Sequence, residues 1–343
     1  MPGQRHLNYI GSKHTLLDWL SESILNKTGW TSFQGKRIAD LFAGTGVVSM
    51  FFRNQGATVL SNDIEPCSSC VSKAMTEGVF TSSVKAYIDR LNAELEAGAY
   101  KQTIGFLTTN YSPCNGCERM FFTVDNAQRM DYCRRHIEDA PLPEAEKNFV
   151  LASLLVSADA VANCASVYGA YLKAFKTTAK KELVLTPLHT CTTPTESQSF
   201  SSDVLEESFL TKLSCDLAYL DPPYNARQYS KNYFPLSVLA LPPDEQEGLA
   251  LSGKTGIPST CFTSSFCSTK TVNQSFETLL STLKAKWVFI SYNSESLLDK
   301  DTLVELMKTH GTVTVLEKDY KRFKSQQKGK KQIKEYLFCL ERV

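Results

Sequence analysis

The sequence has 343 residues, of which 42% are hydrophobic and 21% are charged, and its formal net charge is +1. This size and composition predict one large α/β domain with a sizeable insertion, and the near-neutral charge requires any nucleic-acid-binding surface to be local. No run of about 18 apolar residues occurs, and the N-terminus lacks the apolar core of a secretory signal, so we expect no membrane span and a cytoplasmic protein.

Eleven cysteines are scattered along the chain. An odd number without a secretory signal favours reduced thiols over a disulfide framework. Two pairs have C-x-x-C spacing, Cys67/Cys70 and Cys114/Cys117. A zinc site of this kind has its two pairs about 15–20 residues apart. These pairs are separated by much more, so we expect no metal.

The first clear structural signal is a strand, turn, helix and second strand. The pattern predicts them, in that order, at residues 37–42, 43–46, 47–55 and 57–63. Such a unit is typical of a parallel sheet with right-handed crossovers. The turn opens a helix directly after a strand, where α/β proteins bind nucleotide-like ligands.

The residues of this turn are suited to a nucleotide-like ligand. Gly44 and Gly46 let the backbone approach the ligand closely, and Asp63 can accept hydrogen bonds from ribose hydroxyls. The third glycine of the dinucleotide pattern is missing, because residue 49 is serine. A shorter turn suffices for S-adenosylmethionine, which has no phosphate. By itself, this unit leaves the methyl donor, another nucleotide and a structural turn open.

Between residues 66 and 200 the pattern becomes mainly helical. The helical segments are predicted at 71–96, 126–137 and 148–161. The Ser/Thr-rich stretch 190–202, and later 241–272, are predicted to be surface loops. We therefore expect a catalytic domain of residues 1–75 and 200–343, and a mainly helical insert, 76–199, that includes target recognition.

A second site signal follows the apolar strand predicted at 216–220, which runs directly into Asp221-Pro222-Pro223-Tyr224. This motif is suited to activating the exocyclic amino group of a base for attack on a methyl donor. Such an amino group is a poor nucleophile, because its lone pair is delocalised into the ring. The Asp221 carboxylate and the main-chain carbonyl of Pro222 can accept its two hydrogens, and the two prolines hold that carbonyl rigidly. Tyr224 offers a ring for stacking a flipped-out base. The alternative is a Pro-Pro turn with a capping aspartate.

The C-terminal part predicts a further strand at 286–292, a helix at 301–309 and two antiparallel strands at 312–315 and 335–340, joined by a basic loop. The expected fold class is therefore α/β. It combines a Rossmann-like, mostly parallel sheet with an antiparallel C-terminal hairpin and the helical insert.

Several motifs together resemble the D12 class of adenine-N6 DNA methyltransferases, which includes the Dam enzymes and many restriction-associated methylases. The similar segments are Asn8–Lys13, Asp40–Gly46, Asn62–Asp63, Asp221–Tyr224, 229–239 and 287–293. Their order is that of the family's alpha group, and the resemblance covers most of the chain. It implies S-adenosylmethionine as the cofactor, with a donor pocket lined by Tyr9, Lys13, Phe42, Ala43, Gly44, Thr45, Gly46, Asp63, Asp203 and Asp221. On this reading, Tyr9 packs on the methionine portion and Lys13 meets its carboxylate.

The expected partner is double-stranded DNA, held by basic and aromatic side chains. The candidates are Arg119, Arg129, Arg227, Tyr229, Lys321, Arg322 and Lys324. The last three belong to a basic cluster between residues 318 and 334. A solvated hairpin tip is the alternative for that cluster, and ordinary surface charge is the alternative for the arginines.

Two functional alternatives remain open from the sequence. Methylation of cytosine N4 needs the same two acceptors as methylation of adenine N6. A non-catalytic DNA-binding subunit would keep the fold without the chemistry. We further expect a monomer and a cognate restriction endonuclease that acts as a separate protein.

Overall fold

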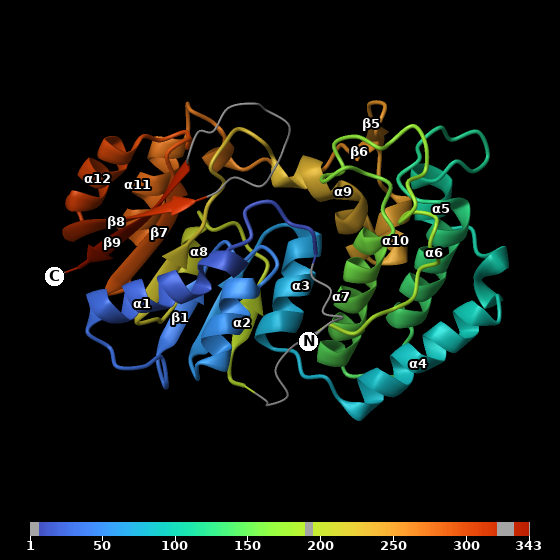
Figure 1. Cartoon of the computed structure of the whole chain (residues 1–343), viewed down its shortest axis with the longest axis horizontal. Helices are drawn as coiled ribbons and strands as arrows, with labels where there is room; N and C mark the ends of the chain where they lie inside the picture. Colours follow the sequence, from blue (N-terminus) through green and yellow to red (C-terminus); the bar gives the residue numbers. More distant parts are fainter. Residues whose placement is uncertain (1–6, 189–194, 321–332, 343) are drawn as a thin grey trace.

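A mixed β-sheet forms the centre of the molecule in a computed structural model that describes residues 7–188, 195–320 and 333–342 (Figure 1). Across these residues the sheet has seven strands in the order β3-β2-β1-β4-β7-β9-β8. The first five in this order are parallel, and β9 runs antiparallel to both β7 and β8. The strands are β1 (Arg37–Asp40), β2 (Thr58–Asn62), β3 (Gln198–Phe200), β4 (Leu217–Leu220), β7 (Trp287–Asn293), β8 (Thr312–Tyr320) and β9 (Ile333–Glu341). The expected fold class is confirmed.

Helices cover both faces of the sheet, because successive residues of each strand point to opposite sides. Ile38 and Leu217 pack toward α1 (Leu17–Thr28) and α2 (Val47–Asn54). Their neighbours Ala39 and Ala218 pack with the opposite layer. That layer contains α8 (Glu207–Leu210), α11 (Val272–Thr282) and α12 (Lys300–Lys308). The central strands β1, β4 and β7 are therefore buried on both sides, which explains the nearly continuous apolar sequences of β4 and β7.

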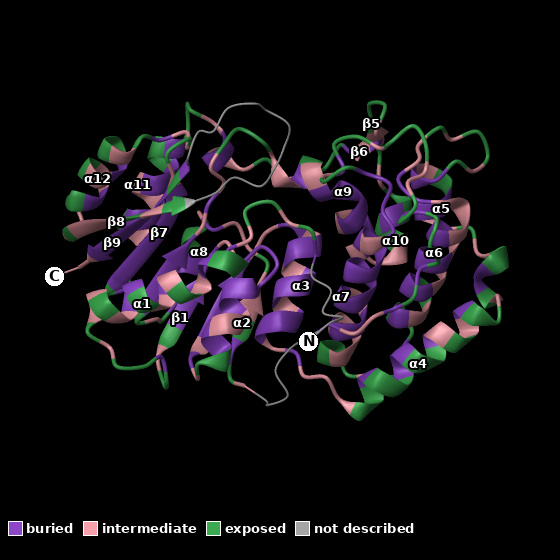
Figure 2. Cartoon of the chain, in the orientation of Figure 1, coloured by how far each residue is buried: buried purple, intermediate pink, exposed green. Residues whose placement is uncertain are grey.

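A third hydrophobic core lies in the helical half of the molecule, where the buried sides of the helices face one another (Figure 2). Its helices are α3 (Pro66–Thr76), α4 (Ser82–Glu96), α5 (Phe106–Tyr111), α6 (Val124–Glu138), α7 (Glu144–Ala160) and α9 (Tyr229–Ala240). The flanking helix α3 also packs against β2 and β3, and α9 follows the Asp-Pro-Pro-Tyr motif. These two helices connect the insert to the sheet.

The structure corrects the helix predicted over residues 71–96, which is divided between α3 and α4. The break falls at Gly78, where an added Cβ would lie 2.3 Å from the Ala74 carbonyl oxygen and 2.9 Å from the Phe149 ring. Glycine thus lets the chain turn directly against α7. Helical periodicity continues across the break and does not reveal it.

The two stretches predicted to be loops also contain short regular elements. Residues 190–202 include β3, and residues 241–272 include α10 (Pro243–Glu247), the hairpin β5–β6 and a 3₁₀ turn at Ser265–Cys267. β5 is Leu251–Ser252 and β6 is Ile257–Pro258; two more 3₁₀ turns are His14–Leu16 and Ala99–Gln102. Segments of two to five residues carry too little periodicity to be recognised in the sequence.

Candidate active site

The two principal motifs meet at the carboxyl edge of the sheet. β1 and β4 are parallel neighbours, with Asp40 paired to Tyr219. The sheet order places β2 on one side of β1 and β4 on the other. This is a topological switch point, where open α/β sheets bind ligands. The glycine turn after β1 and Asp221 after β4 therefore lie at the same edge.

The glycine turn needs its glycines for two different reasons. Gly44 (φ 53°) and Gly46 (φ 72°) both adopt the left-handed conformation. A Cβ at Gly44 would lie 3.0 Å from the Tyr9 ring. A Cβ at Gly46 would lie 2.8 Å from both Ser72 Cα and Met75 Cβ, so Gly46 lets α3 pack closely against the turn. Ala43 and Thr45, on either side of Gly44, are buried, and Phe42 meets Phe266 edge to face.

Asp63 lies beside this turn, as the sequence predicted. Its Oδ2 accepts a 2.8 Å hydrogen bond from the Gly44 amide, and its Oδ1 accepts one of 3.0 Å from the Glu65 amide. Burial raises the pKa of Asp63 to about 6. Burial, reinforced by the negative charge of Asp63, raises the pKa of Glu65 to about 8. Glu65 is a second acid at this edge, and the sequence analysis did not assign it a role.

Asp40 is another acid that the sequence analysis left without a role. Its Oδ2 accepts a 2.6 Å hydrogen bond from Ser49 Oγ. Its Oδ1 is buried and has no hydrogen-bond partner within the described part of the chain. Burial raises the pKa of Asp40 to about 7, and Asp221 and Asp63 contribute to the increase. A buried oxygen without a donor is costly, which fits a site completed by a ligand that donates a hydrogen bond.

The N-terminal segment reaches the site from the helical half of the molecule. The Asn8 amide and side chain both donate 2.9 Å hydrogen bonds to Asp159 Oδ2, at the end of α7. Tyr9 stacks on Tyr233 of α9, with ring centroids 4.7 Å apart. The Ile10 amide donates to Tyr233 Oη at 2.8 Å. No local sequence pattern marks Asp159 as part of the site, because Asn8, which it holds, is 151 residues away.

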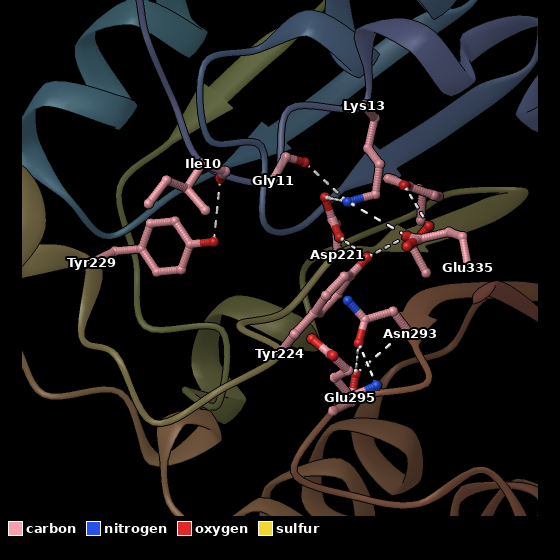
Figure 3. Close-up of polar contacts among 12 residues, drawn as sticks. Ile10, Gly11, Lys13, Asp221, Tyr224, Tyr229, Asn293, Glu295 and Glu335 are labelled. Atoms are coloured by element: carbon pink, nitrogen blue, oxygen red, sulfur yellow. Dashed lines mark hydrogen bonds and ion pairs between the residues drawn. The ribbon is translucent and has the colours of Figure 1, made fainter. Parts of the chain in front are cut away.

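The Asp-Pro-Pro-Tyr motif presents its aspartate to a cluster of polar side chains (Figure 3). Asp221 Oδ2 lies 2.8 Å from Lys13 Nζ, and Asp221 Oδ1 accepts a 2.8 Å hydrogen bond from Tyr224 Oη. Glu335 of β9 completes the cluster, 2.7 Å from Tyr224 Oη and 3.8 Å from Lys13 Nζ. The Lys13 ammonium also donates to the Gly11 carbonyl. The sequence analysis did not identify Glu335.

Two side chains of this cluster have partners within the chain that the sequence did not predict. Lys13, expected to meet the carboxylate of the methyl donor, pairs here with Asp221. Its ammonium also lies 4.8 Å from the centroid of the Tyr224 ring, the ring expected to stack on a base. That ring and the Tyr292 ring are arranged edge to face, with centroids 5.1 Å apart. Asp203 is at the margin of the site, where its Oδ1 accepts a hydrogen bond from the Leu205 amide.

The predicted DNA-contacting residues have different surroundings. Arg129 is buried and pairs with Asp125 and Glu182 while stacking on Tyr100, so a direct DNA contact does not fit its placement. The position of Arg129 in the helical pattern of α6 does not predict its burial, because that burial comes from the segment around Glu182, which packs beside α6.

Three other candidates remain nearer the surface. Arg119 donates to the Lys254 carbonyl of the β5–β6 turn and to the Asn110 carbonyl. Tyr229 donates to the Ile10 carbonyl and so contacts the Asn8–Lys13 segment (Figure 3). Arg227 is exposed directly after the Asp-Pro-Pro-Tyr motif. Lys321, Arg322 and Lys324 lie outside the described residues.

Within residues 7–188, 195–320 and 333–342, the structure has neither a metal-ligating cluster nor a membrane-spanning helix. No group of three or more His, Cys, Asp or Glu side chains there could hold a metal ion. The cysteines in these ranges are free thiols, with Cys67 and Cys70 buried in α3. No helix in the same ranges is both long and apolar enough to span a bilayer.

The chain matches known proteins along nearly its whole length. The family model for D12 class N6 adenine-specific DNA methyltransferases matches residues 9–306. The chain is 39% identical to Type II methyltransferase M.CviAII of Paramecium bursaria Chlorella virus 1, over 97% of each protein. It is 34% identical to Type II methyltransferase M.NlaIII of Neisseria lactamica, over 98% of this chain and 100% of the relative. Type II methyltransferase M.FokI of Planomicrobium okeanokoites is 33% identical over 98% of this chain and 53% of the relative. The chain therefore belongs to the D12 class of N6 adenine-specific DNA methyltransferases.

Proposed function

We propose that this chain takes the methyl group from S-adenosylmethionine and places it on N6 of an adenine flipped out of duplex DNA, with Asp221 and the Pro222 carbonyl holding the amine. The observation that carries the proposal is the position of Asp221. It lies beside the glycine turn at the β1/β4 switch point, close enough to Asp40 that Asp221, like Asp63, raises the pKa of Asp40.

The residues around the glycine turn fit this donor. The donor carries a positive charge on sulfur, an amino group and ribose hydroxyls but no phosphate. Asp40 Oδ1 is a buried acceptor without a donor, and Asp63 supplies carboxylate oxygens next to the Gly44 amide. The Tyr9 ring lies against Gly44 of this turn. When bound, the donor supplies an electrophilic methyl group, and the acidic residues favour its positive charge.

The Asp-Pro-Pro-Tyr motif fits the amine that attacks this methyl group. Two acceptors bind the two hydrogens of the amine and draw them out of the ring plane. The nitrogen lone pair then leaves conjugation with the ring and becomes available for attack. Asp221 lies at the end of β4, and Pro222 is buried, so both acceptors are fixed by the sheet edge. In a duplex the adenine amine is inside the base stack, so the base has to leave the helix to reach them.

The proposal is tested with Asp221→Asn and the matched control Asp216→Asn, at the opposite end of β4. Asp216 is exposed and accepts a hydrogen bond from the Arg37 amide. Labelled methyl transfer to unmodified DNA, donor binding by calorimetry and DNA binding by electrophoretic shift are measured for each protein. Asp221→Asn should lose at least about 100-fold in turnover while both affinities stay within a few fold. Asp216→Asn should behave like the wild type.

Two results would contradict this function. Wild-type turnover in Asp221→Asn would remove the role of the carboxylate. If the unaltered chain binds DNA and the donor but never transfers methyl, the non-catalytic subunit is the correct reading.

A further inference from the structure

The Tyr224 hydroxyl lies between two carboxyl groups and can donate only one hydrogen bond. Its oxygen is 2.8 Å from Asp221 Oδ1 and 2.7 Å from Glu335 Oε1. Both distances are typical of an O–H···O hydrogen bond. An ionised carboxylate has no proton to donate. If both carboxyls were ionised, one of these short contacts would bring two lone pairs together. Both contacts can therefore be hydrogen bonds at the same time only when a second proton, besides that of Tyr224, resides on one of the carboxyl groups.

Lys13 and burial decide where the second proton resides. The Lys13 ammonium lies 2.8 Å from Asp221 and 3.8 Å from Glu335, so it favours the negative charge on Asp221. Glu335 is only 4% exposed, and its burial raises its pKa to about 7, against the opposing effect of Lys13. Asp221 adds to this increase. When this proton is on Glu335, Glu335 donates to Tyr224 Oη and Tyr224 donates to Asp221 Oδ1; when Glu335 is ionised, Tyr224 Oη can donate to Glu335 instead.

Methylation of an amine releases one proton, which has to leave the nitrogen. As the nitrogen–methyl bond forms, the carbon–sulfur bond of the donor breaks and its electron pair stays on sulfur. The nitrogen then gives up one N–H proton and keeps that electron pair. Asp221 is the acceptor in contact with this N–H, and Asp221 Oδ1 is hydrogen-bonded to Tyr224.

We infer that Glu335 is the terminal acceptor of this proton, reached from Asp221 through the Tyr224 hydroxyl. The proton taken up by Asp221 passes to Tyr224 Oη, while the original Tyr224 proton passes to Glu335 Oε1. Asp221 returns to its carboxylate form, and one proton has moved from the nitrogen to Glu335. The step requires Glu335 to be ionised beforehand. This inference rests on the proposed role of Asp221, and Glu335 acts through Tyr224 without touching the base.

The position of Glu335 supports this role. It lies at the start of β9 and pairs in register with Asn293 of β7, so the sheet fixes it against the end of β4 (Figure 3). The ionisable groups that face it are Lys13, Asp221, Tyr224 and Tyr219, and Lys318 of β8 is its partner in register. The pKa of Glu335 is near neutrality, so Glu335 can both receive and release a proton there.

The test uses Glu335→Gln, which retains a group that can hydrogen-bond to Tyr224 but cannot accept a proton. The matched control is Glu317→Gln on the adjacent strand β8, where Glu317 pairs with Lys300 and Lys334. The rate of methyl transfer in a single turnover is measured from pH 5.5 to 9. In the wild type and in the control, the rate should rise through an ionisation near pH 7. Glu335→Gln should lose at least about tenfold at pH 8 and lack that rise.

Two further variants separate a proton relay from structural support. Glu335→Asp retains a carboxyl group and should restore the pH-dependent rise in part. Tyr224→Phe removes the connecting hydroxyl, so adding Glu335→Gln to it should cause no further loss. A wild-type pH profile in Glu335→Gln, or additive losses in the double variant, would overturn the inference. If Asp221→Asn is inactive while Glu335→Gln has the wild-type profile, only the relay fails and the proposed function stands.

Discussion

The close packing of α3 on the glycine turn predicts a large effect for Gly46→Ala. The new Cβ would lie 2.8 Å from Ser72 Cα and Met75 Cβ, and Ser72 Cα is backbone that cannot rotate away. Gly46 also has φ 72°, which an alanine adopts at a cost of about 1–2 kcal/mol. Overpacking typically adds about 1–3 kcal/mol. We therefore expect Gly46→Ala to lower the free energy of unfolding by about 2–5 kcal/mol.

The chain provides a matched control at Gly29, which ends α1. Gly29 has φ 71°, but an added Cβ meets nothing within 4 Å. Gly29→Ala should therefore carry only the backbone cost of about 1–2 kcal/mol. Urea unfolding followed by circular dichroism compares the two variants, and donor titration shows whether moving α3 disturbs Asp63. Equal destabilisation of both variants, with unchanged donor affinity, would refute the packing argument.

Three other predictions concern charged groups away from the catalytic motif. Asp159→Ala should cost about 1–3 kcal/mol of stability and weaken donor binding, because it releases Asn8; unchanged affinity in a donor titration would contradict this. Arg129→Ala should lower stability and leave DNA affinity unchanged, whereas Arg227→Ala should weaken DNA binding and reduce its salt slope by about one. These effects are measured by unfolding and by DNA titration at several salt concentrations, and the reverse pattern would refute the assignments. Burial raises the pKa of Asp40 from 3.8 to about 7, so its contribution to stability is complete below pH 3.8 and is lost as the pH rises through about 7. Asp40→Asn should flatten that loss in unfolding experiments, and an unchanged pH slope would contradict the assignment.

The sequence predicted the features that depend on local backbone chemistry. Gly44 and Gly46 mark a turn because glycine adopts positive φ, and the proline pair marks a rigid segment after a strand. The strand, turn, helix and second strand over residues 37–63 predicted a parallel sheet, and the segments at 216–220 and 286–292 predicted two further strands. With the acid at residue 63, these local signals sufficed for the fold class and for the glycine-turn side of the site.

Only the tertiary structure decided which distant side chains meet there. Glu335 contacts Tyr224 because the pairing of β7 with β9 brings the start of β9 to the end of β4, 111 residues away in the chain. Asp159 at the end of α7 holds Asn8, 151 residues away in the chain. Arg129 is buried because the segment containing Glu182 packs beside α6. Residue type and spacing do not encode these contacts, since strand pairing and helix packing fix which face and which neighbour each side chain receives.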